Sequence, residues 1–217
     1  VQGIIECAPT EDPLECARPL VRELLQKHAA SEVVDALSEA SISQSQCHYF
    51  SHIVGQETYM KYRSTERALA ECSRACGVAC IHGTIGQSFV AEIGLQEDEV
   101  DPEHLSTTEI RQIGKGLCKT SNTCHGVGHV LFMNIRDFTR ALSICDEIVT
   151  GRSRGGCYTG IFMEFSDELV SMSAWDDESV RPEAPAIESL GSFCDSYPLD
   201  KQRACFWYFP FTFGSTY

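Results

Sequence analysis

The 217-residue chain lacks any apolar run close to the roughly 20 residues that a membrane-spanning helix needs. It is also poor in basic residues, because 17 lysines and arginines stand against 31 aspartates and glutamates, a formal net charge of −14. So acidic a chain repels phosphate backbones and anionic lipid headgroups. We therefore expect no membrane insertion and no nucleic-acid partner, whereas a metal cation is easily accommodated.

Several motifs with known chemistry are also missing. The sequence has no Gly-rich nucleotide loop, no nucleophile elbow and no His-Glu-x-x-His motif of zinc proteases. Alternation of β-branched and polar residues is nearly absent, so no sheet is predicted. Hydrophobic residues make up 43% of the chain, which is enough for a folded core. The composition therefore predicts a folded helical protein but does not identify a reaction.

Cysteine is the residue type that stands out, with twelve in the chain. None of them forms the Cys-x-x-Cys spacing of thiolate metal sites, so the even count favours disulfides. A cysteine at the end of one helix can bridge to a cysteine at the start of the next, although Cys72 and Cys76 compete for Cys80. This argument predicts the pairs Cys72–Cys80, Cys118–Cys124, Cys145–Cys157 and Cys194–Cys205. Cys7–Cys16 is expected to close the N-terminal loop, and the two remaining cysteines, Cys47 and Cys76, are expected to pair with each other.

Full pairing of the cysteines implies an oxidising compartment. We therefore expect a secreted or periplasmic protein. The chain begins at Val1 and not at Met, and we expect that a targeting segment has been removed.

Three short motifs occur twice in the same order, which indicates an internal duplication. The Cys-His-x-x-x-His and Cys-x-x-Gly motifs recur 77 residues later, whereas Arg-Ala-Leu-x-x-Cys recurs after 73 residues. The paired copies are 47–52 and 124–129, 67–72 and 140–145, and 80–83 and 157–160.

The predicted fold class is all-α, with stacked helical hairpins (α/α repeats) that are cross-linked by disulfides. Apolar residues at helical spacing predict two helices within residues 14–40, with Ser31 capping the second. We expect an N-terminal loop and helical pair in residues 1–46 and a duplicated domain in 47–217, together one compact domain. The expected copies are about 47–123 and 124–200, with a partial last unit.

Histidines spaced four residues apart are the main functional signal. Such a pair lies on one face of a helix, where both imidazoles can bind one metal ion. If the two copies face one another, their histidine pairs converge on a shared site. His28 and His104 are expected at the surface. The predicted metal ligands are His48, His52, His125 and His129, with His82 as a fifth candidate.

The ligand type suggests which metal would bind. Imidazole ligands suit copper, zinc or nickel, so we expect copper first and zinc second. Two facing His-x-x-x-His helices resemble the ligand arrangement of coupled binuclear copper proteins, the tyrosinases and haemocyanins, but no other part of the chain matches. Thr159 replaces His82 in the second copy, and Glu164 is the nearest carboxylate supplement. The leading hypothesis is a metal-binding protein or, if it is an enzyme, a copper-dependent oxidase that uses O₂.

Two other hypotheses stay open. The histidines could be structural residues copied with the repeat, leaving a non-catalytic helical module that binds another protein. The aromatic segment 206–213 would then be a contact surface, or else core of the last hairpin. The second alternative is a haem-containing redox carrier, because Cys47 and Cys124 each precede a histidine. The full Cys-x-x-Cys-His attachment motif is missing, which disfavours haem.

Overall fold

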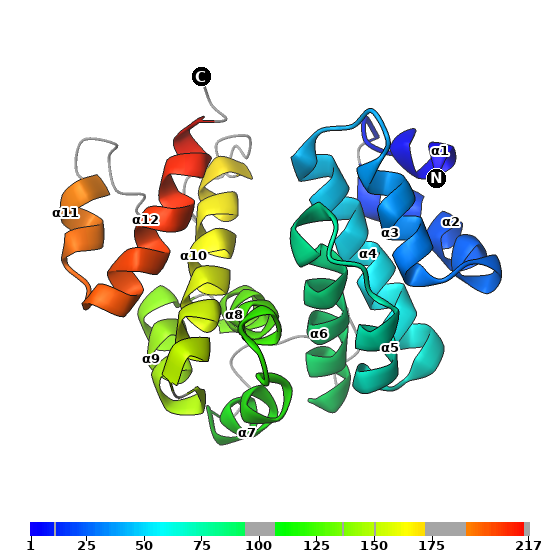
Figure 1. Cartoon of the computed structure of the whole chain (residues 1–217). Helices are drawn as coiled ribbons and strands as arrows, with labels where there is room; N and C mark the ends of the chain where they lie inside the picture. The colour runs from blue at the N-terminus through cyan, green and yellow to red at the C-terminus, as the bar shows by residue number, and fades with distance from the viewer. Residues whose placement is uncertain (11, 94–106, 136, 150, 172–189, 215–217) are drawn as a thin grey trace. The chain divides into compact units, whose positions relative to one another are not determined.

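A computed structural model gives the fold of the chain and describes residues 1–10, 12–93, 107–135, 137–149, 151–171 and 190–214. Every regular element among these residues is a helix, which confirms the all-α prediction. The chain forms two compact units, Val1–Glu99 and Val100–Tyr217 (Figure 1). The predicted boundary between the copies, after residue 123, falls inside the second unit, and the division into copies stays a prediction.

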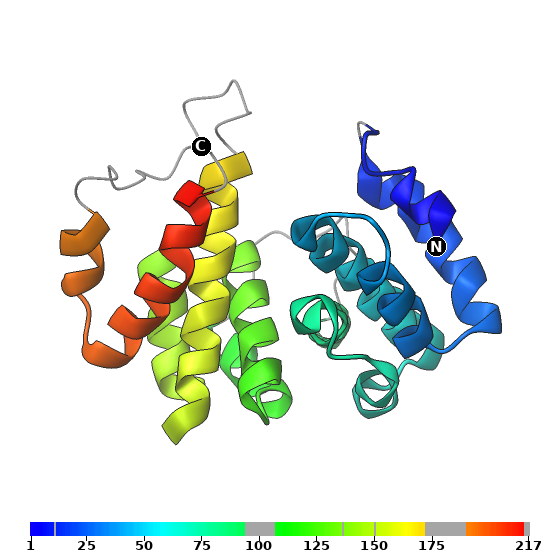
Figure 2. The ribbon, with the colours of Figure 1, turned by 45° about the horizontal axis from the view of Figure 1, so that its top comes forward.

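The first unit is built around one long helix, α4, which packs along α6 and also contacts α2 and α3 (Figure 2). Its buried side chains include Phe50, Ile53 and Val54 from α4 itself. Helix α4 therefore holds the unit together. The helices of this unit are α1 (Gln2–Ile5), α2 (Pro13–Lys27), α3 (Ala30–Ser38), α4 (Gln44–Tyr62), α5 (Thr65–Glu71) and α6 (Ala79–Glu92), with a short 3₁₀ turn η1 (Cys76–Val78).

The helix starts follow local capping chemistry. The Asp12 side chain accepts the backbone N–H groups of two residues in the first turn of α2, and Pro13 occupies the first helical position. The predicted cap at Ser31 is wrong, because α3 already begins at Ala30. The Glu32 carboxylate accepts the Ala29 N–H at 3.0 Å, so an acidic side chain within the first turn satisfies this end.

Small residues allow α4 and α6 to approach until their backbones touch. A Cβ atom built on Gly83 would lie 2.0 Å from the His52 carbonyl oxygen. A Cβ atom on Gly55 would lie equally close, at 2.0 Å, to the Cys80 carbonyl oxygen. No real Cβ tolerates such a distance, so only glycine permits this helix spacing.

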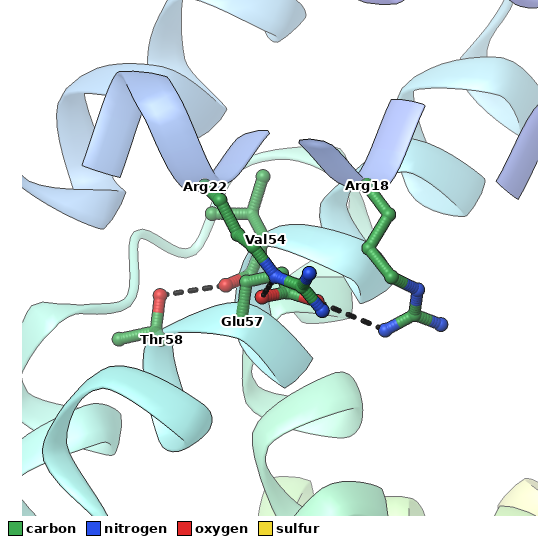
Figure 3. Close-up of polar contacts among 5 residues, drawn as sticks. All are labelled: Arg18, Arg22, Val54, Glu57 and Thr58. Carbon is green, nitrogen blue, oxygen red and sulfur yellow. Dashed lines mark hydrogen bonds and ion pairs between the residues drawn. The ribbon is translucent and has the colours of Figure 1, made fainter. Parts of the chain in front are cut away.

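A buried ion cluster joins α2 to α4 (Figure 3). Glu57 of α4 is only 3% exposed and accepts hydrogen bonds from Arg18 at 3.0 Å and from Arg22 at 2.6 Å. Thr58 next to it is satisfied internally, since its hydroxyl donates to the Val54 carbonyl oxygen. The carboxylate therefore fixes how α2 lies against the helix at the centre of the unit.

The second unit repeats this kind of packing around α10, which packs along both α8 and α12 (Figure 1). A Cβ on Gly160 of α10 would lie 2.0 Å from the His125 carbonyl oxygen, and one on Gly128 would lie 2.1 Å from that of Cys157. The helices of this unit are α7 (Thr107–Leu117), α8 (Ser121–Ile135), α9 (Phe138–Ile148), α10 (Arg154–Ser171), α11 (Leu190–Asp195) and α12 (Leu199–Gly214), with a short 3₁₀ turn η2 (Gly151–Ser153).

A polar cluster ties α12 to α9 and α10. Lys201 donates to Asp146 at 2.6 Å, and the buried Tyr158 donates its hydroxyl to the same carboxylate. Burial, together with this carboxylate, raises the pKa of Tyr158 well above its usual value, so the phenol stays a donor. Further along α12, Phe206 is 41% and Trp207 66% exposed, so the interpretation of these two residues as hairpin core is wrong. The side chains of residues 209–213 lie outside the description.

The twelve cysteines form six disulfides: Cys7–Cys16, Cys47–Cys76, Cys72–Cys80, Cys118–Cys124, Cys145–Cys157 and Cys194–Cys205. These are the six predicted pairs: four from the helix-end argument, the closure of the N-terminal loop and the pair of remaining cysteines. The helices begin one to six residues before the cysteines that were expected to open them, as at Gln44 before Cys47 and at Leu199 before Cys205. In each unit a disulfide therefore closes the turn that leads into a packed helix.

Candidate metal centres

The first centre lies between α4 and α6 of the first unit and contains three histidines. His48 and His52 come from successive turns of α4, and His82 comes from α6. One ring nitrogen of each lies within 4.8 Å of the others. The ring centroids of His82 are 5.7 Å from His48 and 5.6 Å from His52. His82 is 3% exposed, whereas the other two are half-buried. The three imidazoles can therefore act together on one ion that is partly screened from water.

A backbone carbonyl sets the tautomer of His48. The Nδ1 atom of His48 lies 2.9 Å from the Cys76 carbonyl oxygen. A carbonyl oxygen can only accept, so Nδ1 carries the hydrogen and the Nε2 of the neutral ring carries a lone pair. That Nε2 lies 3.0 Å from the Nε2 of His52. The carbonyl thus holds the ring with its ligand atom aimed at the other histidine, the arrangement typical of metal-bound imidazoles.

The turn that supplies this carbonyl has an uncommon backbone. Cys76, Gly77 and Val78 all have positive φ angles, of 52°, 66° and 60°. Positive φ is costly for a β-branched residue such as valine, by about 1–3 kcal/mol. A Cβ on Gly77 would approach His48 Nδ1 to 3.1 Å, so the turn also leaves little space there. Because Cys76 is bonded to Cys47, the turn is covalently tied to the residue preceding His48.

The second centre lies between α8 and α10 of the second unit. His125 and His129 of α8 have their Nε2 atoms 2.9 Å apart. Two side chains of α10 hold the other ring nitrogens: Thr159 Oγ1 lies 2.8 Å from His125 Nδ1, and Glu164 Oε1 lies 2.5 Å from His129 Nδ1. Both histidines are buried, at 7% and 2% exposed. Each ring is therefore held on one side by α10 and points its second nitrogen at the other ring.

Helix packing puts the two histidine pairs in different registers. In the first unit Gly83 of α6 meets the carbonyl of His52, whereas in the second unit Gly160 of α10 meets that of His125. Relative to the partner helix, His125 therefore takes the place of His52, and His129 lies one turn beyond it. The sequence repeat aligns His52 with His129, whereas the helix packing aligns His52 with His125, one helical turn earlier.

The five predicted ligands thus fall into two groups, three in the first unit and two in the second. Convergence of both pairs on one site stays a prediction. Glu164, predicted as a carboxylate supplement, hydrogen-bonds to His129 and orients it. The sequence reasoning missed the Cys76 carbonyl and the role of Thr159 as a histidine partner. His28 is exposed as expected, with 51% of its side chain accessible, and His104 lies outside the described residues.

The disulfides bear on the haem hypothesis. Cys47 and Cys124, the cysteines of the two Cys-His dipeptides, are both disulfide-bonded. A thioether link to haem needs a free thiol, so neither sulfur is available for one.

In searches of protein families, curated proteins and solved structures, no match to this chain was found, so the two histidine centres have to be interpreted from their own geometry.

Proposed function

We propose that the chain is a secreted or periplasmic metal-binding protein that holds its ions on buried histidine nitrogens. The observation that carries this proposal is the group formed by His48, His52 and His82, whose nitrogens lie within 4.8 Å of one another. Many metal centres are built from three histidines and keep a further coordination position open. Three imidazoles that approach this closely match that arrangement.

The compartment follows from cysteine chemistry. All twelve cysteines are in disulfides, which persist only under oxidising conditions and so indicate an extracellular location. Within the described part of the chain, no helix is both long and apolar enough to cross a bilayer. The protein would therefore bind metal where extracellular ions are accessible.

Copper is the metal that we propose first, with zinc second. With metal–nitrogen bonds of about 2.0–2.1 Å, nitrogens 3.0 Å apart subtend an angle of about 91–97° at the ion. Zinc prefers regular tetrahedral coordination, which needs ligand nitrogens about 3.3 Å apart. A right angle matches two neighbouring corners of the square-planar geometry typical of copper(II). The spacing between His48 and His52 therefore favours copper.

If the protein is an enzyme, we propose a copper-dependent oxidase that uses O₂. Two of the three histidines are half-buried, so an open position of the ion would be reachable from solvent. Oxygen uptake by the copper-loaded protein, measured with an oxygen electrode in the presence of an oxidisable phenol, tests this extension separately from metal binding.

Metal binding itself is tested by substituting His82. We expect His82→Ala to lower copper affinity by at least tenfold, because it removes one of three nitrogen ligands. The measurement is calorimetric titration of the full chain with copper(II), with metal content after dialysis determined by elemental analysis. His28→Ala is the matched control, since this exposed histidine is far from both centres in the sequence and should leave affinity unchanged.

Equal copper affinity of His82→Ala and His28→Ala would contradict the proposal for the first unit. Absence of copper and zinc binding by the wild-type chain would contradict it for the whole protein. That second result would favour a non-catalytic protein-binding module, for which Phe206, Trp207 and the 62%-exposed Leu199 on α12 offer a contact surface.

A further inference from the structure

The hydrogen bonds around His125 determine where its proton lies. The Thr159 hydroxyl donates its only hydrogen to the Gly156 carbonyl oxygen at 2.7 Å. Its oxygen can then only accept from His125, so Nδ1 of His125 is the donor in their 2.8 Å contact. The Nε2 atom of a neutral His125 therefore carries a lone pair.

The same reasoning applies to His129. Its Nδ1 lies 2.5 Å from Glu164, and an ionised carboxylate has no hydrogen to donate. Nδ1 of His129 is again the donor, and Nε2 of the neutral ring carries a lone pair. The two Nε2 atoms that face each other at 2.9 Å are thus both acceptors. Two imidazole nitrogens that both present lone pairs at this distance are arranged as ligands of one cation.

We propose that the second unit contains its own metal site, in which the Nε2 atoms of His125 and His129 bind one copper(II) or similar divalent transition-metal ion. This inference rests on the proposed function for the class of ligand. It concerns the histidines of the second unit and predicts one ion for each unit. Thr159 and Glu164 are positioning residues, because they act on the metal through the rings that they hold.

The geometry fits an ion without large movement. Nitrogens 2.9 Å apart subtend an angle of about 90° at a metal with bonds of about 2.0–2.1 Å. The contact from Glu164 to His129 forms the carboxylate–histidine–metal arrangement that increases the basicity of a ligating imidazole. It also places a negative charge one ring away from the cation. The centre therefore offers two ligand nitrogens, a fixed tautomer for each ring and a carboxylate that partly neutralises the charge of the ion.

The alternative to a metal ion between the two rings is a proton that they share. The experiment distinguishes the metal ion from the shared proton. Copper(II) alone is the probe, titrated into the full chain in which His52→Ala and His82→Ala remove the first centre. We expect one copper per chain to remain, against two in the wild type. Nitrogen couplings in its electron paramagnetic resonance spectrum should show two equatorial imidazoles. Adding His129→Ala to this background should abolish the remaining binding and both couplings.

Conservative variants test the positioning role. Glu164→Gln and Thr159→Val each leave both ligand nitrogens in place, and each should weaken copper binding at this centre by about 10–100-fold. The pattern of two nitrogen couplings should be kept once the site is saturated, which a general loss of structure would not allow. Circular dichroism of each variant checks that the helices are retained.

Three outcomes would overturn the inference. The first is that the wild-type chain binds only one copper ion, and that this ion is lost both when the first centre is removed and when His129 is replaced. The second is no copper binding in the background without the first centre. The third is nitrogen-15 spectra of the metal-treated protein that show a proton shared between the two rings. Failure of the proposed function differs from these, since it removes copper binding from the first centre whatever the second one does.

Discussion

At the scale of single residues, the state of each centre depends on groups that bind no metal. The Cys76 carbonyl, the Thr159 hydroxyl and the Glu164 carboxylate each accept a hydrogen from an Nδ1 atom. Each of them thereby leaves an Nε2 atom as the potential ligand. These outer contacts make the difference between a histidine that merely fills the core and one that is prepared to bind an ion.

Glu57 provides a residue-scale prediction about stability. Glu57→Gln should lower the free energy of unfolding by about 2–3 kcal/mol, because it removes the buried negative charge that Arg18, with a side chain only 15% exposed, contacts at 3.0 Å. Urea unfolding followed by circular dichroism measures the change.

Glu23→Gln is the control for this prediction. Glu23 forms an exposed ion pair with Lys27, and such pairs contribute little to stability. Similar losses in the two variants would show that burial of Glu57 has no special effect.

At the scale of helices, close contact between two helices forms each centre. His48, His52 and His82 meet because Gly55 and Gly83 let α4 and α6 touch. The corresponding glycines of α8 and α10 fix the second pair one turn away from the equivalent place. We propose that the two units arose by duplication and that the histidines changed register afterwards. This proposal accounts for a three-histidine group in one unit and a two-histidine group in the other.

Replacing a contact glycine is the prediction at this scale. Gly83→Ala should destabilise the protein by about 1–3 kcal/mol or more, because the new methyl group would force the α4 and α6 backbones apart. It should also weaken copper binding, since His82 would move away from His48 and His52. Thermal unfolding and copper titration measure the two effects.

Gly116→Ala in α7 is the matched control, because a Cβ there has open space within 4 Å. This change should be neutral or slightly stabilising, as expected for alanine in a helix. If both variants behave alike, close packing of α4 on α6 does not determine the site.

At the scale of the whole molecule, covalent cross-links hold short segments of a helical chain. The disulfides join cysteines that are 6 to 29 residues apart, so each closes a fairly small loop. Such bridges stabilise the folded state mainly by restricting the unfolded chain, by about 2–3 kcal/mol each. The six together are expected to contribute about 10 kcal/mol or more, comparable to the whole stability of an ordinary domain.

Reduction should therefore unfold the protein. In a strong thiol or phosphine reductant at neutral pH we expect most of the helical circular dichroism to be lost, together with copper binding. The same measurement on the oxidised protein is the control. Retention of full helicity after all twelve thiols have been titrated as free would contradict this expectation.

The sequence was sufficient for the helical class, for the six cysteine pairs and for the histidines worth examining. These features depend on periodicity and on spacing along the chain, which local rules describe well. The exact first residue of each helix was harder to predict from the sequence. The cap at Ser31 was misplaced because an acidic residue in the first turn can satisfy the helix end instead, and a sequence pattern does not decide between the two.

What the sequence determined by itself was therefore local: which segments form helices, and which cysteines lie close enough to bridge. Only the tertiary structure decided which histidine faces which. The two His-x-x-x-His pairs have the same spacing, but the pair on α4 and the pair on α8 lie in different registers against their partner helices, because the glycine contacts set that register. The tertiary structure also decided that Thr159 and Glu164 accept the Nδ1 hydrogens, since those contacts join residues more than thirty positions apart. Packing between distant segments sets such contacts, and no local pattern encodes it.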